Sequence, residues 1–346
     1  MRTVEPPTEA SLLALANRLA ASAGRGPARA MSRLAGGKNN QVYRVETAAG
    51  APLVLKCYFS DPRDPRDRLR AEWDFLQYAW SRGIRSIPAP LAADATAHAA
   101  LYGFVEGRKL LASELGAAHI DAAIDFVVAL NEHPRAELAP GSEACFTLTE
   151  HVATIERRIA RLAILDPDVP HVREATSFVS GQLLPSWNAV KSRLVSGAHV
   201  AGLSMEQALG PDDCCLSPSD FGFHNALVDD AGVVTFLDFE YAGRDDPAKL
   251  VSDFFCQPEI PVPVAYHAHF IDRMAKGLAL DEAAIVRCRL LLDAYKVKWA
   301  CIILNDFLPV GAARRAFADT GAWDARCADQ LAKAAATLAA LGTHID

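Results

Sequence analysis

Three polar residues stand close together in the segment 216–243, which reads LSPSDFGFHNALVDDAGVVTFLDFEYAG. They are Asp220, Asn225 five positions later, and Asp238 at the end of an apolar run. Carboxylate and amide oxygens are the ligands that Mg²⁺ prefers. The spacing therefore predicts a divalent-cation site with an additional carboxylate beside it. The alternative is that Asp220 and Asp238 are ordinary turn and cap residues, as many loop aspartates are.

A predicted hairpin explains how the two metal-ligating candidates could meet. The runs ALV and VVTFL are strand-like, and the DDAG between them has the composition of a tight turn. Folding about that turn places Val228 opposite Val233. Asn225 and Asp238 then emerge at the same open end of the hairpin.

A second candidate pair lies much earlier in the chain. Lys56 has apolar neighbours on both faces of a predicted strand, so its ammonium group is expected to be buried and to need a partner. Glu72 falls on or beside the buried stripe of a predicted helix, 68–80. A strand lysine followed by a core-side helix glutamate is the pairing with which kinases hold the α- and β-phosphates of a nucleotide. The alternative is a glutamate that reaches solvent at the edge of the stripe.

A glycine-containing loop, AGGKNN at 35–40, lies between two predicted strands. Small residues such as Gly36 and Gly37 let backbone N–H groups approach phosphate oxygens closely. The loop matches neither of the standard phosphate-binding glycine motifs. An ordinary hairpin turn is the alternative interpretation.

The periodicity of the chain predicts an α+β protein with two lobes. The boundary is placed between residues 105 and 106, so that 1–105 would be a nucleotide-binding lobe and 106–346 a larger, mostly helical lobe with the catalytic loop, the metal site and the substrate pocket. The first lobe is expected to hold a five-stranded antiparallel sheet with one helix. Its strands are predicted at 30–34, 41–47, 52–58, 89–93 and 99–104. Helices are predicted at 8–22, 68–80, 120–130, 149–165, 172–195, 262–278, 281–307 and 323–341.

Composition excludes several classes of protein. The formal net charge of −7 provides no general basic surface for nucleic acid. Eight scattered cysteines without metal-site spacing indicate free thiols in a reducing compartment. The first ten residues lack the basic start and apolar run of a signal peptide, and no apolar stretch is long enough for a membrane span. The sequence therefore predicts a cytoplasmic protein without nucleic-acid or membrane partners, expected to be a monomer or a homodimer.

Taken in order, these residues resemble a known family. Gly36-Gly37, Lys56, Glu72, the Glu106-Gly107 break and the blocks Asp220…Asn225 and Asp238-Phe-Glu-Tyr are similar to those of the aminoglycoside phosphotransferase and choline/ethanolamine kinase group of small-molecule kinases. The resemblance spans about residues 30–255 and rests mainly on the D-x-x-x-x-N…D-F-E-Y block. It implies the bilobal fold of protein kinases.

The resemblance also implies a role for each matched residue. Asp220 would accept the proton of the substrate hydroxyl, and Asn225 and Asp238 would bind Mg²⁺. The residues that would hold ATP, with GTP as the alternative, are Gly36, Gly37, Lys56, Glu72, Gly103 and Val105. Of these, Gly103 and Val105 would meet adenine through their backbone.

Two positions depart from the family pattern. Asp220-Phe-Gly spells the DFG of protein kinases, but no catalytic Asp…Asn pair precedes it, so Asp220 is assigned to the catalytic loop. Family members usually carry a histidine two residues before this aspartate, where this chain has Pro218. An acidic residue is also usual at Leu250, and Asp253 lies close to that position.

The leading hypothesis is an ATP- and Mg²⁺-dependent O-phosphotransferase for a small hydroxyl-bearing acceptor. An amino alcohol and a sugar or polysaccharide precursor are ranked level, and an aminoglycoside third. Tyr295 and Trp299 could contact a cationic acceptor, whereas Lys296 and Lys298 on the same helix could equally mark an anionic one. The alternative function is a catalytically weak or inactive nucleotide-binding regulator, since Pro218 replaces the usual histidine.

Overall fold

The structure is a computed structural model of the chain and describes residues 8–34, 40–48, 50–60, 64, 66–132, 138–309 and 320–342. Two compact units can be distinguished. Unit 1 comprises Met1–Glu114, Asp125–Ser142 and Leu216–Arg244, and unit 2 comprises Leu115–Ile124, Glu143–Cys215 and Asp245–Asp346. The division of the chain into lobes at residue 105 stays a prediction.

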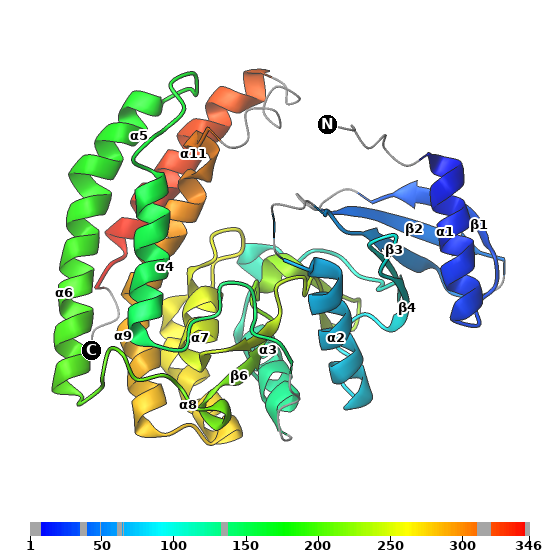
Figure 1. The fold of residues 1–346 in the computed structure, drawn as a ribbon, viewed down its shortest axis with the longest axis horizontal. Helices are drawn as coiled ribbons and strands as arrows, with labels where there is room; N and C mark the ends of the chain where they lie inside the picture. Colours follow the sequence, from blue (N-terminus) through cyan, green and yellow to red (C-terminus); the bar gives the residue numbers. More distant parts are fainter. Residues whose placement is uncertain are drawn as a thin grey trace. The chain divides into compact units, whose positions relative to one another are not determined.

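Unit 1 is built on a five-stranded antiparallel sheet with the order β1-β2-β3-β5-β4 (Figure 1). Its strands are β1 (Ala28–Arg33), β2 (Gln41–Thr47), β3 (Leu53–Cys57), β4 (Pro90–Asp94) and β5 (Ala99–Gly103). All five were predicted, and β2 has the predicted bounds. β3 is the central strand, and it pairs with β2 and β5 along its whole length.

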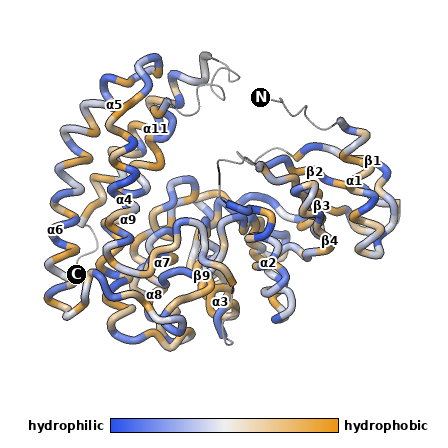
Figure 2. Tube along the Cα trace, viewed as in Figure 1, coloured by the Kyte–Doolittle hydropathy of each residue, from blue (hydrophilic) through white to orange (hydrophobic). Residues whose placement is uncertain are grey.

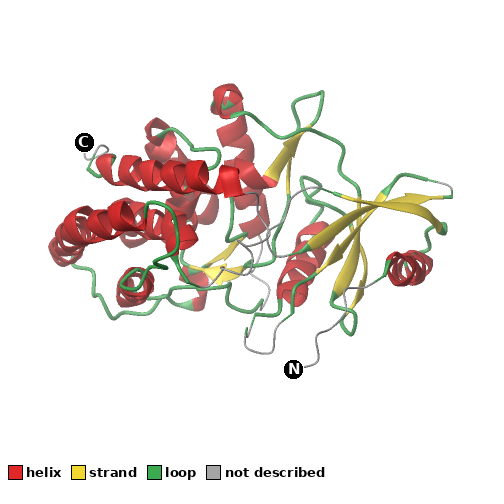
Figure 3. Cartoon of the chain, turned by 90° about the horizontal axis from the view of Figure 1, so that it is seen from above, coloured by secondary structure: helices red, strands yellow, loops and turns green. Residues whose placement is uncertain are grey.

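Two helices cover opposite faces of this sheet (Figure 3). Helix α1 (Glu9–Ser22), capped by Thr8, packs on the face that carries Leu55. Because successive strand residues point to opposite faces, the next residue, Lys56, faces the other side, where α2 (Arg68–Ser81) lies. The sequence predicted both helices but counted only one with the sheet.

Most of the remaining elements of unit 1 lie later in the chain. The hairpin strands β7 (Ala226–Val228) and β8 (Val234–Phe236) carry Asn225 and Asp238 at their ends. Short strands β6 (Cys215–Ser217) and β9 (Gly243–Asp245) form a separate two-stranded sheet. The part of helix α3 (Ala117–Asn131) from Asp125 onwards also belongs to unit 1, and its Phe126 packs against Phe221 and Phe236.

Unit 2 is mostly helical and is organised around the long helix α9 (Glu282–Ile303). The helices that pack on it are α4 (Leu148–Arg161), α6 (Leu184–Val200), α7 (Pro247–Cys256), α8 (His267–Leu278) and α11 (Thr320–Ala339). Hydrophobic and hydrophilic residues alternate along α5 (Val172–Phe178) and α6 (Figure 2). With a five-stranded sheet in unit 1 and mostly helices in unit 2, the α+β class that the sequence predicted is confirmed.

Two predicted helices differ in detail from the structure. The predicted helix 172–195 is interrupted by a π-helical turn, Val179–Leu183, between α5 and α6. The predicted helix 262–278 begins only at His267, because Pro261 and Pro263 hold the chain extended before a short 3-10 turn. In the part of the chain that the structure describes, none of the helices has the length and hydrophobicity needed to span a bilayer.

Candidate active site

Lys56 is the cation at the centre of the predicted site. Its Nζ lies 2.6 Å from Glu72 Oε2 and 2.6 Å from Asp238 Oδ1. The lysine and glutamate side chains are almost fully buried, whereas the Asp238 side chain is 36% exposed. The partner that the sequence predicted for Lys56 is therefore present. The contact with Asp238 was not predicted.

The charges of this group depend on one another. Burial by itself would lower the pKa of Lys56, but the carboxylates of Glu72 and Asp238 outweigh it and raise that pKa above its ordinary value. Burial also raises the pKa of Glu72, with the charge of Asp238 acting in the same direction. The glutamate therefore relies on the lysine ammonium to remain ionised.

Two tyrosines hold Glu72 in place from the other side. The Tyr58 hydroxyl donates to Glu72 Oε2 at 2.8 Å and lies 2.7 Å from the Tyr102 hydroxyl. Burial raises the pKa of Tyr58 well above its ordinary value. Neither tyrosine was predicted to belong to the site. The spacing was informative, since Tyr58 follows Lys56 by two residues and so faces the same side of the chain.

Asp238 has an unusual backbone conformation. Its φ of 66° lies in the left-handed region. For a residue other than glycine this conformation costs about 1–3 kcal/mol, and it occurs preferentially at functional sites. The next residue, Phe239, stacks on Phe75 of α2 with ring centroids 4.7 Å apart. Since Phe75 follows Glu72 by three residues, this contact helps to hold Asp238 close to the Lys56–Glu72 pair.

The hairpin brings Asn225 next to the segment that carries Asp238, because the Leu237 N–H donates to the Asn225 carbonyl at 2.8 Å. The predicted register was wrong by one residue, and Val228 lies opposite Val234. Asp229 causes the shift. Its Oδ1 accepts from the N–H groups of Ala231 and Val233, which lengthens the loop by one residue.

Asp220 and Asn225 are in direct contact. Asn225 Nδ2 donates to the Asp220 carbonyl at 3.0 Å and lies 3.5 Å from Asp220 Oδ2. With its Nδ2 directed at Asp220, the amide leaves its Oδ1 for a cation. The Asp220 side chain is 38% exposed, so its carboxylate is accessible to a substrate.

These donors fit a magnesium ion that arrives with a nucleotide. Among the described residues, no group of three or more His, Cys, Asp or Glu side chains could hold a metal by itself. Mg²⁺ is commonly bound by one or two protein ligands together with substrate phosphates and water. One amide oxygen from Asn225 and one half-exposed carboxylate from Asp238 suit that mode of binding.

Comparison with known proteins decides the family. Residues 30–254 match the model of the phosphotransferase enzyme family, APH. The chain belongs to this family. A search of curated proteins finds no significant match.

Solved structures of APH-like enzymes share the fold at low sequence identity. Spectinomycin phosphotransferase APH(9)-Ia, in complex with ADP and spectinomycin, is 12% identical, with a TM-score of 0.60 over 96% of this chain and 99% of that one. Choline kinase LicA from Streptococcus pneumoniae is 15% identical, with a TM-score of 0.56 over 90% and 94%. Amicoumacin kinase hAmiN, in complex with AMP-PNP and Ca²⁺, is 16% identical, with a TM-score of 0.51 over 90% and 88%. The fold is that of the APH enzymes, which resembles the protein-kinase fold.

The structure says less about the other residues that were predicted to hold the nucleotide. Gly36 and Gly37 lie outside the described residues. Gly103 ends β5, and its N–H donates to the Ala89 carbonyl, so this N–H is already engaged. Val105 lies in the loop after β5 and is half-buried. Their roles at adenine stay predictions.

The charged and aromatic residues of α9 have internal partners in unit 2. Lys298 Nζ donates to both oxygens of Asp253, at 2.7 and 2.9 Å, and Trp299 Nε1 donates to the same carboxylate. Lys296 is buried and pairs with Asp293. Tyr295 is buried with its hydroxyl 2.7 Å from His151 Nδ1. These contacts give the residues a structural explanation, so they support neither a cationic nor an anionic acceptor.

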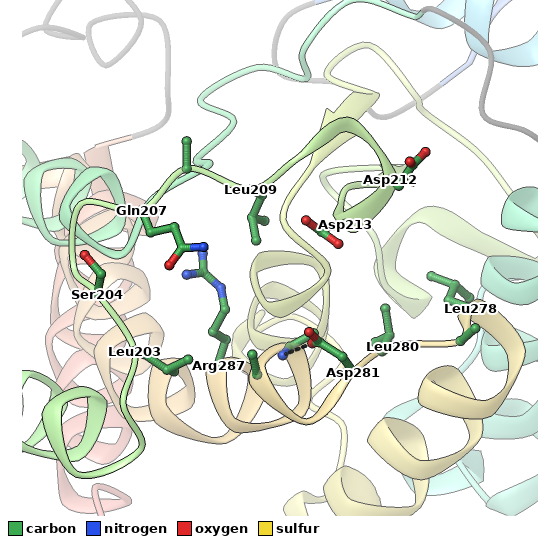
Figure 4. Close-up of a pocket in the computed structure, with 14 residues that line it drawn as sticks. Leu203, Ser204, Gln207, Leu209, Asp212, Asp213, Leu278, Leu280, Asp281 and Arg287 are labelled. Carbon is green, nitrogen blue, oxygen red and sulfur yellow. Dashed lines mark hydrogen bonds between the residues drawn. The ribbon is translucent and has the colours of Figure 1, made fainter.

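A cavity of about 170 Å³ lies within unit 2 between the segment 203–213 and the start of α9 (Figure 4). Its charged lining is largely committed to local structure. Asp213 accepts from the Gly210 N–H, Asp281 caps α9, and Arg287 pairs with Asp246. None of the predicted site residues lines this cavity.

Proposed function

We propose that this APH-family protein transfers the γ-phosphate of ATP to a hydroxyl group of a small molecule. The observation that carries the proposal is the position of Lys56 Nζ, at 2.6 Å from both Glu72 and Asp238, in the same unit as Asp220 and Asn225. A buried, permanently charged lysine next to a half-exposed carboxylate is suited to polyphosphate with a bound cation.

Each side chain would then have a defined task. Lys56 would hold the α- and β-phosphates, with Glu72 and Tyr58 keeping its ammonium group in position. Asn225 and Asp238 would hold Mg²⁺, which when bound neutralises the charge that develops on the phosphates.

Asp220 would orient the acceptor and remove its proton. The acceptor oxygen forms a bond to the γ-phosphorus while the bond from that phosphorus to the β,γ-bridging oxygen breaks. The hydroxyl proton passes to Asp220, and the products are ADP and a phosphate monoester. Phosphoryl transfer through a loose transition state depends mainly on such positioning and charge neutralisation.

For the acceptor we retain an amino alcohol or a sugar or polysaccharide precursor, ahead of an aminoglycoside. Similar structures include kinases for choline, spectinomycin and amicoumacin, so the fold accommodates several chemical classes. The Asp238-Phe-Glu-Tyr sequence is similar to that of choline kinases, and it supports an amino alcohol or a sugar precursor over an aminoglycoside.

The test is a phosphate-transfer screen with Mg·ATP over amino alcohols, sugars and aminoglycosides. We expect one class to become phosphorylated with stoichiometric release of ADP. The second candidate function, a nucleotide-binding protein without turnover, is favoured only by Pro218 at the usual histidine position. It predicts thermal stabilisation by ATP with neither transfer nor slow hydrolysis.

A further inference from the structure

His224 contacts the predicted catalytic carboxylate. It lies four residues after Asp220 on the short 3-10 turn Phe223–Asn225, and its Nε2 is 3.2 Å from Asp220 Oδ1. Its side chain is only 11% exposed. Nothing in the spacing of the metal ligands required a histidine here, and the sequence analysis assigned it no role.

The chemistry of the contact identifies the donor. An ionised carboxylate only accepts hydrogen bonds, so the ring nitrogen that faces Asp220 is the one that carries hydrogen. Nδ1 of His224 is buried and has no hydrogen-bond partner among the residues that the structure describes. The polar contact of the ring is therefore directed at Asp220.

The two oxygens of Asp220 are held unequally. Oδ1 accepts from His224 at 3.2 Å, whereas Asn225 Nδ2 is 3.5 Å from Oδ2 and donates mainly to the Asp220 carbonyl. The chain before Asp220 is fixed as well, since Ser219 has a φ of 69° and its N–H donates to Ser217 Oγ. Oδ1 is thus held more closely by the protein, and Oδ2, with only the longer contact to Asn225, is the oxygen that can face a substrate.

We propose that His224 is the positioning residue for the catalytic base. It donates from Nε2 to Asp220 Oδ1 and fixes the rotation of the carboxylate, so that Oδ2 accepts the hydroxyl proton of the acceptor. The inference rests on the proposed function. It assigns to His224 the support that the family pattern places at the position of Pro218. Two charged residues contact His224. Asp220 lies against its ring, and Lys109 Nζ donates to its backbone carbonyl.

Two substitutions separate hydrogen-bond donation from acid–base chemistry. His224→Ala removes the donor, and we expect kcat to fall about 10- to 100-fold with the KM for ATP unchanged, because a misplaced catalytic group is costly even at small displacements. His224→Gln keeps an N–H donor and cannot titrate, so it should retain most of the wild-type kcat and pH profile. His199→Ala, at an exposed position on α6, is the matched control.

Three results would overturn the inference. They are an unchanged kcat in His224→Ala, an equal loss in His224→Gln, or a loss explained by a lower Tm of both variants. A readout independent of turnover is the ring tautomer from long-range ¹H–¹⁵N spectra, assigned by difference with His224→Gln. We expect hydrogen on Nε2 and a shift of that signal in Asp220→Asn, and an Nε2 without hydrogen would contradict the proposal. If the wild type transfers no phosphate, the proposed function fails. The spectra still test whether His224 donates a hydrogen bond to Asp220.

Discussion

Both units of the molecule place carboxylates next to basic side chains, but the carboxylates differ in how far they are exposed. In unit 1, Asp220 and Asp238 keep more than a third of their side chains exposed, and Asp238 has a left-handed backbone. In unit 2, Asp246 is buried and accepts from His151 Nε2 at 3.0 Å and from Arg287 Nε at 3.1 Å.

A second group in unit 2 follows the same pattern as Asp246. Lys249 Nζ donates to Asp245 Oδ2 at 2.7 Å, and Lys298 donates to Asp253. All four side chains are less than 8% exposed. In unit 2 these carboxylates have internal partners, so loss of one charge leaves a buried cation without its counter-charge. The open sides of Asp220 and Asp238 remain available for chemistry. Substitution of a buried carboxylate in unit 2 should therefore lower stability, and substitution of a partly exposed carboxylate in unit 1 should lower activity.

The largest effect in this comparison is expected at Asp238, the carboxylate proposed to bind the metal. Asp238→Asn keeps the shape of the side chain and the tolerance for positive φ, but removes the charge that faces Lys56 and the cation. We expect kcat to fall about 10³-fold, measured by ADP release at saturating Mg·ATP. The free energy of unfolding should change by less than about 1 kcal/mol, since the side chain is partly exposed. Substantial turnover in this variant would remove Asp238 from the site.

The converse effect is expected in unit 2. Asp246→Asn leaves His151 and Arg287 facing a neutral partner in a buried position, so the free energy of unfolding should fall by about 3–5 kcal/mol. Urea denaturation measures it, with the exposed Asp168→Asn as the matched control. Activity per folded molecule should be retained. A stable variant that is inactive would show that the two groups of carboxylates are not distinguished in this way.

Lys56→Met should have a smaller effect, directed at the nucleotide. Loss of a charge-assisted contact of about 1.5–3 kcal/mol should weaken ATP binding about 10- to 100-fold, as measured by titration calorimetry. Without the ammonium group, Glu72 is expected to take up a proton, because burial and Asp238 raise its pKa. Unchanged ATP affinity would argue against Lys56 as a phosphate ligand.

The most gradual effect is a dependence of stability on pH. Burial lowers the pKa of His151, but its hydrogen bond with Asp246 and the neighbouring charges outweigh burial and raise the pKa from 6.5 to about 9. The folded state therefore binds this proton more tightly than the unfolded state. Its contribution is complete below pH 6.5 and is lost as the pH rises towards 9, by at most about 1.4 kcal/mol per pH unit. His151→Gln should have a flatter profile over this window, and parallel profiles would refute the assignment.

The sequence predicted those parts of the fold and the site that depend on local pattern. Alternating strands and a helical stripe with one acidic residue were sufficient to place Lys56 opposite Glu72. The Asp…Asn…Asp spacing placed the two metal candidates, Asn225 and Asp238, at the open end of one hairpin, beside Asp220 in the preceding loop. These features follow from the two- and 3.6-residue periods of strands and helices.

What the sequence did not give depends on side chains that meet in three dimensions. The contact of Lys56 with Asp238 spans 182 positions and has no local signal. The hairpin register was missed because a side chain, Asp229, determines the loop length. The contact of His224 with Asp220 is different, since the separation of four residues was visible in the sequence. It was not predicted, because the family pattern places the supporting histidine at the position of Pro218 and not after the aspartate.

The most direct test of the account is the rate of γ-phosphate transfer by the wild type and by Asp220→Ala, measured with the same Mg·ATP and the acceptor identified in the screen. Asp220 is accessible and its removal should leave the fold intact, so equal unfolding free energies are expected. The account predicts a loss of kcat of about 10²- to 10⁴-fold with ATP binding preserved. Turnover that survives the substitution would contradict the assignment of Asp220 as the catalytic base.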